Sequence, residues 1–255
     1  MKIALLCGEG ISTNIVYNYL ASKTNIGIVI IEEPVNKKAF IKNRIKKLGF
    51  LTVVGQILFS LLVIPILIST SKKRFQEICS DNLLDISEKF LLSDKCKRVS
   101  SVNSSETIQY LKEYAPDIVV VNGTRIISEN VLSSCDARFI NMHAGITPAY
   151  RGVHGGYWAL YNDDIENCGV TVHFVDKGID TGGILGQARI SPTSQDNFTT
   201  YPVLQIAAGL ELEYKAIKDI ENNSFSIQEN GLPSKLYTHP TIFQYLYRYF
   251  TKKIK

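Results

Sequence analysis

The chain predicts an α/β fold: a Rossmann-like, mostly parallel sheet with helices on both faces and a helical insertion. Short apolar, β-branched runs such as Ile26–Ile31 recur without polar alternation, which is typical of strands buried on both faces. Helix-length segments separate most of these runs, and this alternation favours parallel pairing. The length of 255 residues and the apolar fraction of 45% suit one large domain with a full core.

The first elements follow a strand–helix–strand order. Lys2–Cys7 is an apolar run that predicts a strand, and a glycine turn leads from it to a helical pattern over Thr13–Ser22. Ile26–Ile31 predicts the second strand. Residues 34–90 then alternate basic and apolar blocks, which indicates helices inserted into the βα plan.

The alternation of strands and helices resumes after the insertion. Ser104 or Ser105 can cap a helix that runs through Tyr114. The later predicted elements are strands at Asp117–Val121, Ala137–Met142, Gly169–Val175 and Gly183–Ile190, and a helix over Thr199–Glu221. We therefore expect a domain over residues 1–225 and a C-terminal extension over residues 226–255.

The insertion contains an uncharged stretch, Leu48–Ser71, with basic residues at both ends. It is long enough to span a bilayer, but glycine, glutamine and proline interrupt it. A spanning helix would also separate the first two strands from the rest of their sheet. We expect a buried or interfacial helical hairpin, with peripheral membrane contact through residues 42–71 as a hypothesis that places Lys42–Lys47 near anionic headgroups.

Composition excludes several classes of function. The net charge of +4 is mild and predicts no nucleic-acid partner. The four histidines have no metal-ligand spacing, so we expect no metal, and His173 lies in an apolar run that favours a core or strand-face role. The five cysteines form no CxxC pair, and the apolar start ends at Gly8, too soon for a signal peptide. We expect a cytoplasmic protein with reduced thiols; a homo-oligomer stays open.

One constellation predicts chemistry. Asn141 and His143 end a predicted strand and, two residues apart, project to the same side. A Gly/Pro turn follows, and Tyr150-Arg151-Gly152 brings a guanidinium back towards them. Asp180 comes after another strand, next to glycines that let a ligand approach the backbone. Donors for an oxyanion beside a carboxylate are what a one-carbon acyl transfer to an amine requires.

The first glycine loop, Gly8-Glu9-Gly10-Ile11-Ser12-Thr13, has three interpretations. It is a partial dinucleotide fingerprint, with Glu32 or Glu33 at the end of the next strand but Thr13 at the third glycine position. Its backbone N–H groups at a helix N-terminus suit any phosphate, and it can also be a tight turn. Among these we favour phosphate, and assign Gly8, Gly10 and Ser12 to the acceptor substrate.

The segments NMHAGITPAYRGVHGGYWAL and GVTVHFVDKGIDTGGILGQ resemble the catalytic core of the 10-formyltetrahydrofolate-dependent formyltransferases. That family includes glycinamide ribonucleotide, methionyl-tRNA and nucleotide-linked amino-sugar formyltransferases. The resemblance covers about Asp117–Gln187 and, more faintly, the N-terminal strand and glycine loop. It implies a folate formyl donor, no metal, and Asn141, His143 and Asp180 as the catalytic residues.

The resemblance also implies binding residues. Those for the pterin ring would be Arg125, Ile126, Ile127, Asp176, Gly178 and Ile179. On the acceptor side we place Tyr150, Arg151 and His154. Arg151 would bind the acceptor's phosphate or, alternatively, lock the loop with a carboxylate. The loop Ala144–Thr147 and the helical insertion depart from the family pattern, and no C-terminal β-barrel is evident, which argues against tRNA as the acceptor.

These features predict formyl transfer from 10-formyltetrahydrofolate to a small phosphorylated or nucleotide-linked amine. Asn141 and a cationic His143 would donate to the alkoxide, and Asp180 would hold the imidazolium and accept the amine proton. A nucleotide-linked amino sugar is the favoured acceptor and glycinamide ribonucleotide the second candidate. The competing functions are those of a formyl-folate hydrolase, a non-catalytic folate- or nucleotide-binding protein and a dehydrogenase.

Overall fold

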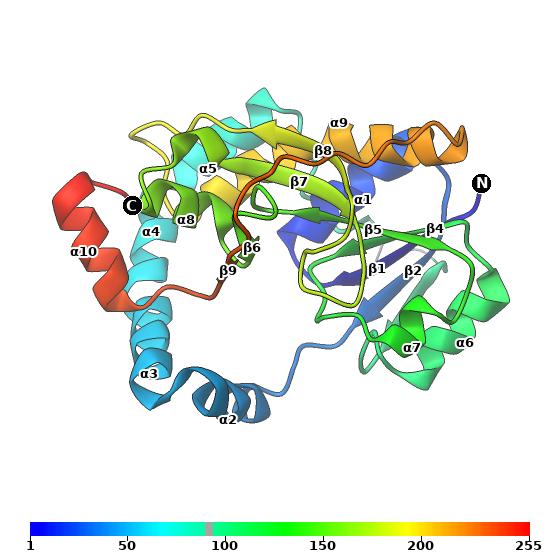
Figure 1. Cartoon of the computed structure of the whole chain (residues 1–255), viewed down its shortest axis with the longest axis horizontal. Helices are drawn as coiled ribbons and strands as arrows, with labels where there is room; N and C mark the ends of the chain where they lie inside the picture. Colours follow the sequence, from blue (N-terminus) through cyan, green and yellow to red (C-terminus); the bar gives the residue numbers. More distant parts are fainter. Residues whose placement is uncertain (90–93) are drawn as a thin grey trace.

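The computed structural model describes residues 1–89 and 94–255. The expected end of the insertion, at residue 90, lies outside them. A central sheet organises the molecule (Figure 1). Its strands in the described part of the chain are β1 (Ile3–Gly8), β2 (Ile26–Glu32), β3 (Cys96–Val99), β4 (Ile118–Asn122), β5 (Arg138–His143), β7 (Gly169–Phe174) and β8 (Ile184–Arg189).

The strand order is β3-β2-β1-β4-β5-β7-β8. Pairing is parallel from β3 to β5, while β7 is antiparallel to both β5 and β8. The predicted fold class is therefore confirmed. The direction of the chain in the sheet changes between β1 and β4, so ligands are expected beside the carboxyl ends of these strands. The sequence did not predict β3, because this short edge strand carries the polar sequence Cys-Lys-Arg-Val.

Helices cover both faces of the sheet, as predicted. Alternate β1 residues face opposite layers: Ile3 and Leu5 join one apolar cluster, and Ala4 and Leu6 the other. The first layer contains α1 (Ile11–Lys23), α5 (Lys72–Asp81) and α9 (Tyr201–Glu221). The second contains α6 (Ser105–Tyr114), which Ser104 caps by accepting a hydrogen bond from the Thr107 N–H, and α7 (Glu129–Leu132).

The insertion joins β2 to β3 and corrects one expectation. Its described part contains α2 (Lys37–Leu48), α3 (Phe50–Leu58), the π-helical turn η1 (Phe59–Val63), α4 (Ile64–Thr70) and α5. The expected hairpin is wrong, because α3, η1 and α4 form one continuous helix. The wide turn allows Pro65 without a break: the Ile64 N–H reaches back to the Phe59 carbonyl just before the proline. Phe50–Thr70 is long and apolar enough to cross a membrane, by length and composition alone.

A third apolar cluster joins the insertion to the C-terminal part of the chain. Phe59 and Leu67 pack with Tyr157, Phe198 and Tyr245. The surrounding elements are β6 (Arg151–Gly152), α8 (Gly155–Tyr161), η3 (Ile165–Asn167), β9 (Leu236–Tyr237) and α10 (Ile242–Lys252). β6 pairs with β9, so the segment expected as an extension returns to the domain at the loop that follows β5.

Candidate active site

The predicted catalytic side chains meet where β5 lies beside β7. Asn141 and His143 stand at the carboxyl end of β5, opposite His173 and Thr171 of β7. Asp180 follows β7, in the loop that returns to β8. The three residues predicted from sequence are thus brought together, and His173 joins them.

His143 is held tightly and is only 6% exposed. Its Nε2 lies 2.7 Å from the Tyr150 carbonyl oxygen. Since a carbonyl only accepts hydrogen bonds, Nε2 carries the proton and Nδ1 of the neutral ring is unprotonated. Nδ1 lies 3.4 Å from Asp180 Oδ2. The ring therefore presents a proton acceptor on the side of the carboxylate.

Gly145 is required for this placement. A Cβ at this position would clash with the Tyr150 carbonyl oxygen and lie 2.7 Å from His143 Nε2. Thr171 fixes the same turn, since its hydroxyl donates to the Gly145 carbonyl at 2.8 Å and accepts the Thr147 N–H at 3.1 Å. The turn after β5 is thus packed around the imidazole.

Asp180 is positioned by the Tyr150-Arg151-Gly152 loop. Its Oδ2 accepts the Gly152 N–H at 2.8 Å, and the Arg151 guanidinium donates to the Ile179 carbonyl at 3.0 Å. Asp180 itself has a positive φ of 52°, a conformation that is unfavourable for most residues and persists where neighbouring contacts enforce it. Arg151 thus holds the loop through a backbone carbonyl, where a carboxylate partner was expected, and its binding of the acceptor's phosphate stays a prediction.

His173 extends the cluster. Its Nδ1 donates to the Phe174 carbonyl at 2.7 Å, so Nε2 accepts the Asn141 amide N–H at 3.3 Å. The same Nε2 lies 3.7 Å from Asp180 Oδ1. Sequence reasoning favoured a core or strand-face role for this buried histidine. The signal that it missed is the antiparallel direction of β7, which places His173 directly across from Asn141.

Burial governs the charge of the site. It lowers the pKa of His143, and the opposing effects of Asp180 and the Tyr150 carbonyl do not overcome it. Burial alone would raise the pKa of Asp180, but the neighbouring His173 and His143 rings and the Gly152 N–H hold that pKa below its usual value. The carboxylate is therefore ionised and the His143 imidazole neutral at pH 7. This differs from the expected cationic His143.

The glycine loop lies at the carboxyl end of β1, next to that of β4. A Cβ on Gly8 would lie 2.5 Å from the Gly123 carbonyl oxygen, so the two loops touch. Thr13, at the third glycine position, donates its hydroxyl hydrogen to the Gly8 carbonyl at 2.6 Å and accepts from Asn122 at 2.9 Å. Gly10 precedes α1 and no side chain caps the helix. The first N–H groups of α1 therefore have no side-chain acceptor, and Ser12 lies beside them.

One of the two acidic residues considered for the partial dinucleotide fingerprint, Glu32, is already engaged. Glu32 is buried, accepts the N–H groups of Val102 and Arg125 at 3.1 and 2.7 Å, and lies 2.6 Å from Arg125 Nε. It connects β2 to two loops and is not available for a ribose hydroxyl. A dinucleotide fingerprint would therefore depend on Glu33, the other acidic residue considered.

Two segments were assigned to the pterin: Arg125–Ile127, which follows β4, and Asp176–Ile179, which follows β7. Both lie next to the same apolar cluster. Ile127 is buried in this cluster and the partly buried Val175 packs against it, whereas Ile126 is exposed. Asp176 accepts the Gly178 N–H at 3.0 Å and forms a turn, while Lys177 pairs with Glu129 of α7 at 2.5 Å. The Arg125 side chain turns away towards Glu32 and the Glu33 carbonyl. We therefore expect its backbone, rather than its guanidinium, to face a ligand.

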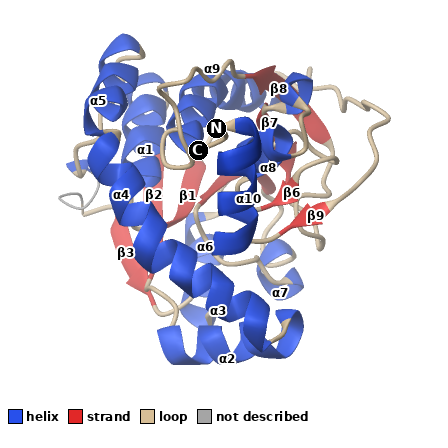
Figure 2. Cartoon of the chain, turned by 90° about the vertical axis from the view of Figure 1, so that its left-hand side faces the viewer, coloured by secondary structure: helices blue, strands red, loops and turns tan. Residues whose placement is uncertain are grey.

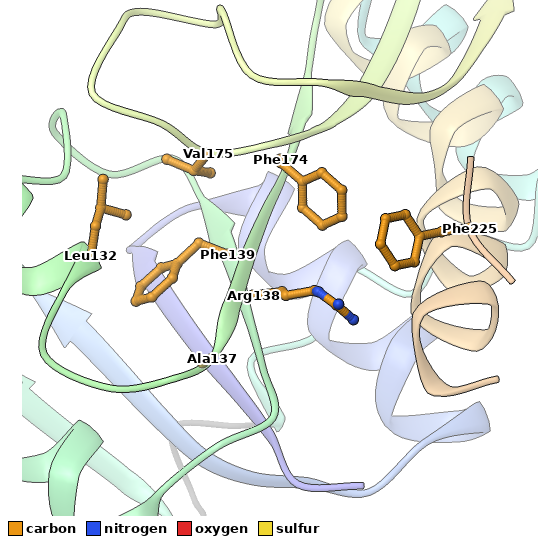
Figure 3. Close-up of a pocket in the computed structure, with 7 residues that line it drawn as sticks. All are labelled: Leu132, Ala137, Arg138, Phe139, Phe174, Val175 and Phe225. Atoms are coloured by element: carbon orange, nitrogen blue, oxygen red, sulfur yellow. The ribbon is translucent and has the colours of Figure 1, made fainter. Parts of the chain in front are cut away.

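A cavity of about 320 Å³ opens beside this cluster (Figure 3). Its walls are Leu132, Ala137, Arg138, Phe139, Phe174, Val175 and Phe225. Leu132, Phe139 and Val175 also pack with the Ile127 cluster, and the Arg138 guanidinium lies 4.6 Å from the centre of the Phe225 ring. None of the predicted catalytic residues lines it. The cavity adjoins the pterin segments without reaching the carboxylate and imidazoles.

Two residues predicted for the acceptor have other contacts. The Tyr150 side chain is buried, donates to Asp164 at 2.8 Å and stacks on Tyr237. The His154 ring lies 2.9 Å from the His239 ring and packs on Phe198, and burial lowers its pKa to about 3. Both side chains stabilise the third cluster. Adjacency in sequence suggested a shared site, but these side chains point away from it.

A family model described as formyl transferase matches residues 62–204. Because this match covers more than half of the chain and includes the residues around His143 and Asp180, the chain belongs to the formyl transferase family. The predicted resemblance is confirmed.

The relatives differ in their acceptors. The chain is 30% identical over 139 residues to the methionyl-tRNA formyltransferase of Chlorobium chlorochromatii (strain CaD3), covering 54% of this chain and 44% of that protein. It is 38% identical over 98 residues to the phosphoribosylglycinamide formyltransferase of Escherichia coli (strain K12), covering 37% and 46%. The chain thus spans less than half the length of these curated relatives.

Solved structures support the same fold. The N-formyltransferase from Helicobacter canadensis, in complex with folinic acid and dTDP-3-aminofucose, matches with a TM-score of 0.57 and 17% identity over 93% of this chain and 71% of that one. The phosphoribosylglycinamide formyltransferase from Streptococcus pneumoniae TIGR4 matches with a TM-score of 0.54 and 19% identity over 87% and 99%.

Proposed function

We propose that this chain transfers a formyl group from 10-formyltetrahydrofolate to the primary amine of a small phosphorylated or nucleotide-linked acceptor, in the cytoplasm. The observation that carries the proposal is the position of Asp180 Oδ2, 3.4 Å from His143 Nδ1, in a chain of the formyl transferase family. A buried imidazole with an unprotonated nitrogen beside an ionised carboxylate is suited to accept a proton.

The reaction follows from these protonation states. The acceptor amine attacks the formyl carbonyl and gives an alkoxide next to an ammonium group. His143 Nδ1 takes the ammonium proton, and Asp180 stabilises the imidazolium that forms. The Asn141 amide donates to the alkoxide; one such donor contributes roughly 3 kcal/mol to lowering a barrier. Collapse of the intermediate expels the folate nitrogen, which takes the proton back from Nδ1, and His143 returns to its neutral form.

The residues available for the folate fit a pterin. Exposed Ile126 offers an apolar surface, and the Asp176–Ile179 turn offers backbone polar groups beside it. An aromatic ring edged with N–H and C=O groups requires both. We place the pterin between these two segments, with Gly178 and Ile179 on one side, Ile126 and the Arg125 backbone on the other, and buried Ile127 supporting them.

For the acceptor we favour a nucleotide-linked amino sugar. The α1 N-terminus, with Gly8, Gly10 and Ser12, has no side-chain cap and can bind a phosphate through backbone N–H groups. Several solved N-formyltransferases of sugars share the fold over most of this chain. Glycinamide ribonucleotide is the second candidate, because the similarity to phosphoribosylglycinamide formyltransferase reaches 38% identity over 98 residues.

The test is acceptor-dependent consumption of 10-formyltetrahydrofolate. The purified chain is incubated with the folate and, separately, with nucleotide-linked amino sugars, glycinamide ribonucleotide and water alone, and the formylated product is identified by mass spectrometry. We expect product from an amino sugar, and none from the His143→Ala variant. Consumption without an amine would indicate a hydrolase. Folate binding without turnover of any tested amine would favour a non-catalytic binding protein.

A further inference from the structure

The continuous helix formed by α3, η1 and α4 has one face fixed to the domain. Val53, Phe59 and Leu67 are buried on it. The Gln56 amide donates to the His239 carbonyl at 2.5 Å, and Ser60 Oγ lies 3.1 Å from His239 Nε2. The helix therefore belongs to the fold and can present only its other face to a partner.

That other face is apolar and exposed. Leu51, Leu61 and Ile66 are 82%, 67% and 62% exposed. Exposed residues recur at helical spacing, which places them along one side of the helix. The exposed apolar side chains are those of Phe50, Leu51, Leu58, Leu61, Leu62, Ile66 and Ile68. Soluble proteins rarely expose large apolar patches, and where such patches occur they mark interaction sites.

Helix α10 lies beside this helix and also has an exposed apolar side. It packs on α3 and η1, where Tyr245 contacts Phe59 with 5.1 Å between ring centres. Its opposite side exposes Phe243, Tyr247 and Phe250 at i, i+4 and i+7. Figure 2 shows these helices: α3 and α4 cross the front of the molecule, with α10 beside them and α2 at the lower end. We call the exposed side of α3, η1 and α4 the outer face.

The outer face is bordered by positive charge. Between Pro34 and Gln76 there are nine basic residues and no acidic one, and there is no acidic residue from Asn230 to Lys255. Helix α2 buries none of its side chains and carries Lys46 and Lys47 in its last turn. An apolar helix face flanked by lysines matches the acyl chains and the anionic headgroups of a membrane surface.

We propose that the outer face docks the chain onto an anionic phospholipid bilayer without crossing it. The sheet excludes a crossing, because β2 precedes the helix, β3 follows it, and the two strands are hydrogen-bonded neighbours. Both ends of the helix therefore lie on the same side of the membrane. Leu61 and Ile66 enter the boundary between headgroups and acyl chains, while Lys46 and Lys47 contact lipid phosphates. The proposal stands independently of the formyl transfer reaction.

The experiment is flotation of the full chain with phosphatidylcholine vesicles that contain or lack about one third phosphatidylglycerol. We expect at least tenfold tighter binding to the anionic vesicles, weakened by high salt. Leu61→Ser/Ile66→Ser should reduce binding at least tenfold, and Lys46→Glu/Lys47→Glu should abolish the preference for anionic lipid. The matched control is Leu83→Ser/Ile86→Ser, which alters two exposed aliphatic residues in a segment held against α1 by Asn14 and Asn18.

Each possible outcome decides the question. Failure of the wild-type chain to float with anionic vesicles would overturn the proposal, as would equal binding by the Leu61→Ser/Ile66→Ser variant. The competing occupant is a second copy of the chain. A dimer found by sedimentation without lipid, and lost in Leu61→Ser/Ile66→Ser, would assign the outer face to self-association. Variants that lose vesicle binding but keep wild-type turnover in solution have lost the docking surface and not the reaction.

Discussion

Replacing Asp180 with Asn removes the charge opposite His143 while keeping the shape of the side chain. The Asn carbonyl oxygen can still accept the Gly152 N–H, so the loop should keep its position. Only the stabilisation of the imidazolium is lost. Two unit charges 3.4 Å apart attract by about 5 kcal/mol at an effective dielectric constant of about 20. That energy corresponds to between three and four factors of ten in rate.

We therefore expect Asp180→Asn to lower kcat about 1000-fold, within the range of about 10² to 10⁴ found for general acid–base catalysis. The assay is the rate of tetrahydrofolate formation with the amine that the wild-type chain accepts, measured across pH. Since Asp180 raises the pKa of His143 against the larger effect of burial, its loss should lower that pKa further. The acid limb of the kcat/KM profile should move to lower pH while the plateau falls.

Asp163→Asn is the matched control. Asp163 is an exposed carboxylate paired with Arg248 at 2.7 Å, outside the site, and its replacement should change kcat less than twofold. A fall of less than tenfold in Asp180→Asn, or an acid limb that moves to higher pH, would refute the proposed role of the carboxylate. An unchanged KM for folate would confirm that the defect lies in proton transfer.

Three further predictions concern individual residues. His143→Ala should retain the wild-type circular dichroism spectrum and lose at least about 100-fold in kcat; near-normal turnover would refute its assignment. Gly145→Ala should also lose about 100-fold in kcat, because its Cβ displaces the imidazole, whereas Gly186→Ala, whose Cβ would meet only a Leu212 methyl group at 3.4 Å, should stay active. Glu213 is fully buried, and burial raises its pKa to about 8. In the unfolded chain Glu213 ionises above its ordinary pKa of 4.5, whereas in the folded chain it stays neutral up to about pH 8. The free energy of unfolding should therefore fall between about pH 4.5 and about pH 8, by up to roughly 1.4 kcal/mol per pH unit. Glu213→Gln should flatten this dependence and raise the urea midpoint at pH 8; parallel pH profiles of the two proteins would contradict the cause.

The sequence predicted those parts of the fold that local patterns determine. Mainly apolar strands such as Ile118–Asn122 and the Ser104 cap are visible in a single segment. The spacing of Asn141 and His143 is also local, since two residues on one strand share a side. Asp180 was found because its glycine-rich context marks a loop that a ligand can approach.

The missed features depend on contacts between distant segments. His173 enters the site because β7 runs antiparallel to β5, a direction that its apolar sequence does not encode. Tyr150 and His154 turn into an aromatic cluster built by Tyr237, Phe198 and His239. The neutral charge of His143 follows from its burial. The sequence shows that His143 and Asp180 can pair, but it does not show how far the fold buries the imidazole away from solvent.

The long connection between β2 and β3 has a consequence for how this chain can vary. The 63 residues from 33 to 95 leave and re-enter the sheet at adjacent strands. Lengthening a flexible connection fourfold, from a typical helical crossover, costs only about 1.2 kcal/mol of closure entropy. Segments with neighbouring ends can be extended, trimmed or exchanged without shifting the register of any strand. Parts of this connection that bury no side chain, such as α2, can thus vary while the residues around His143 stay in place.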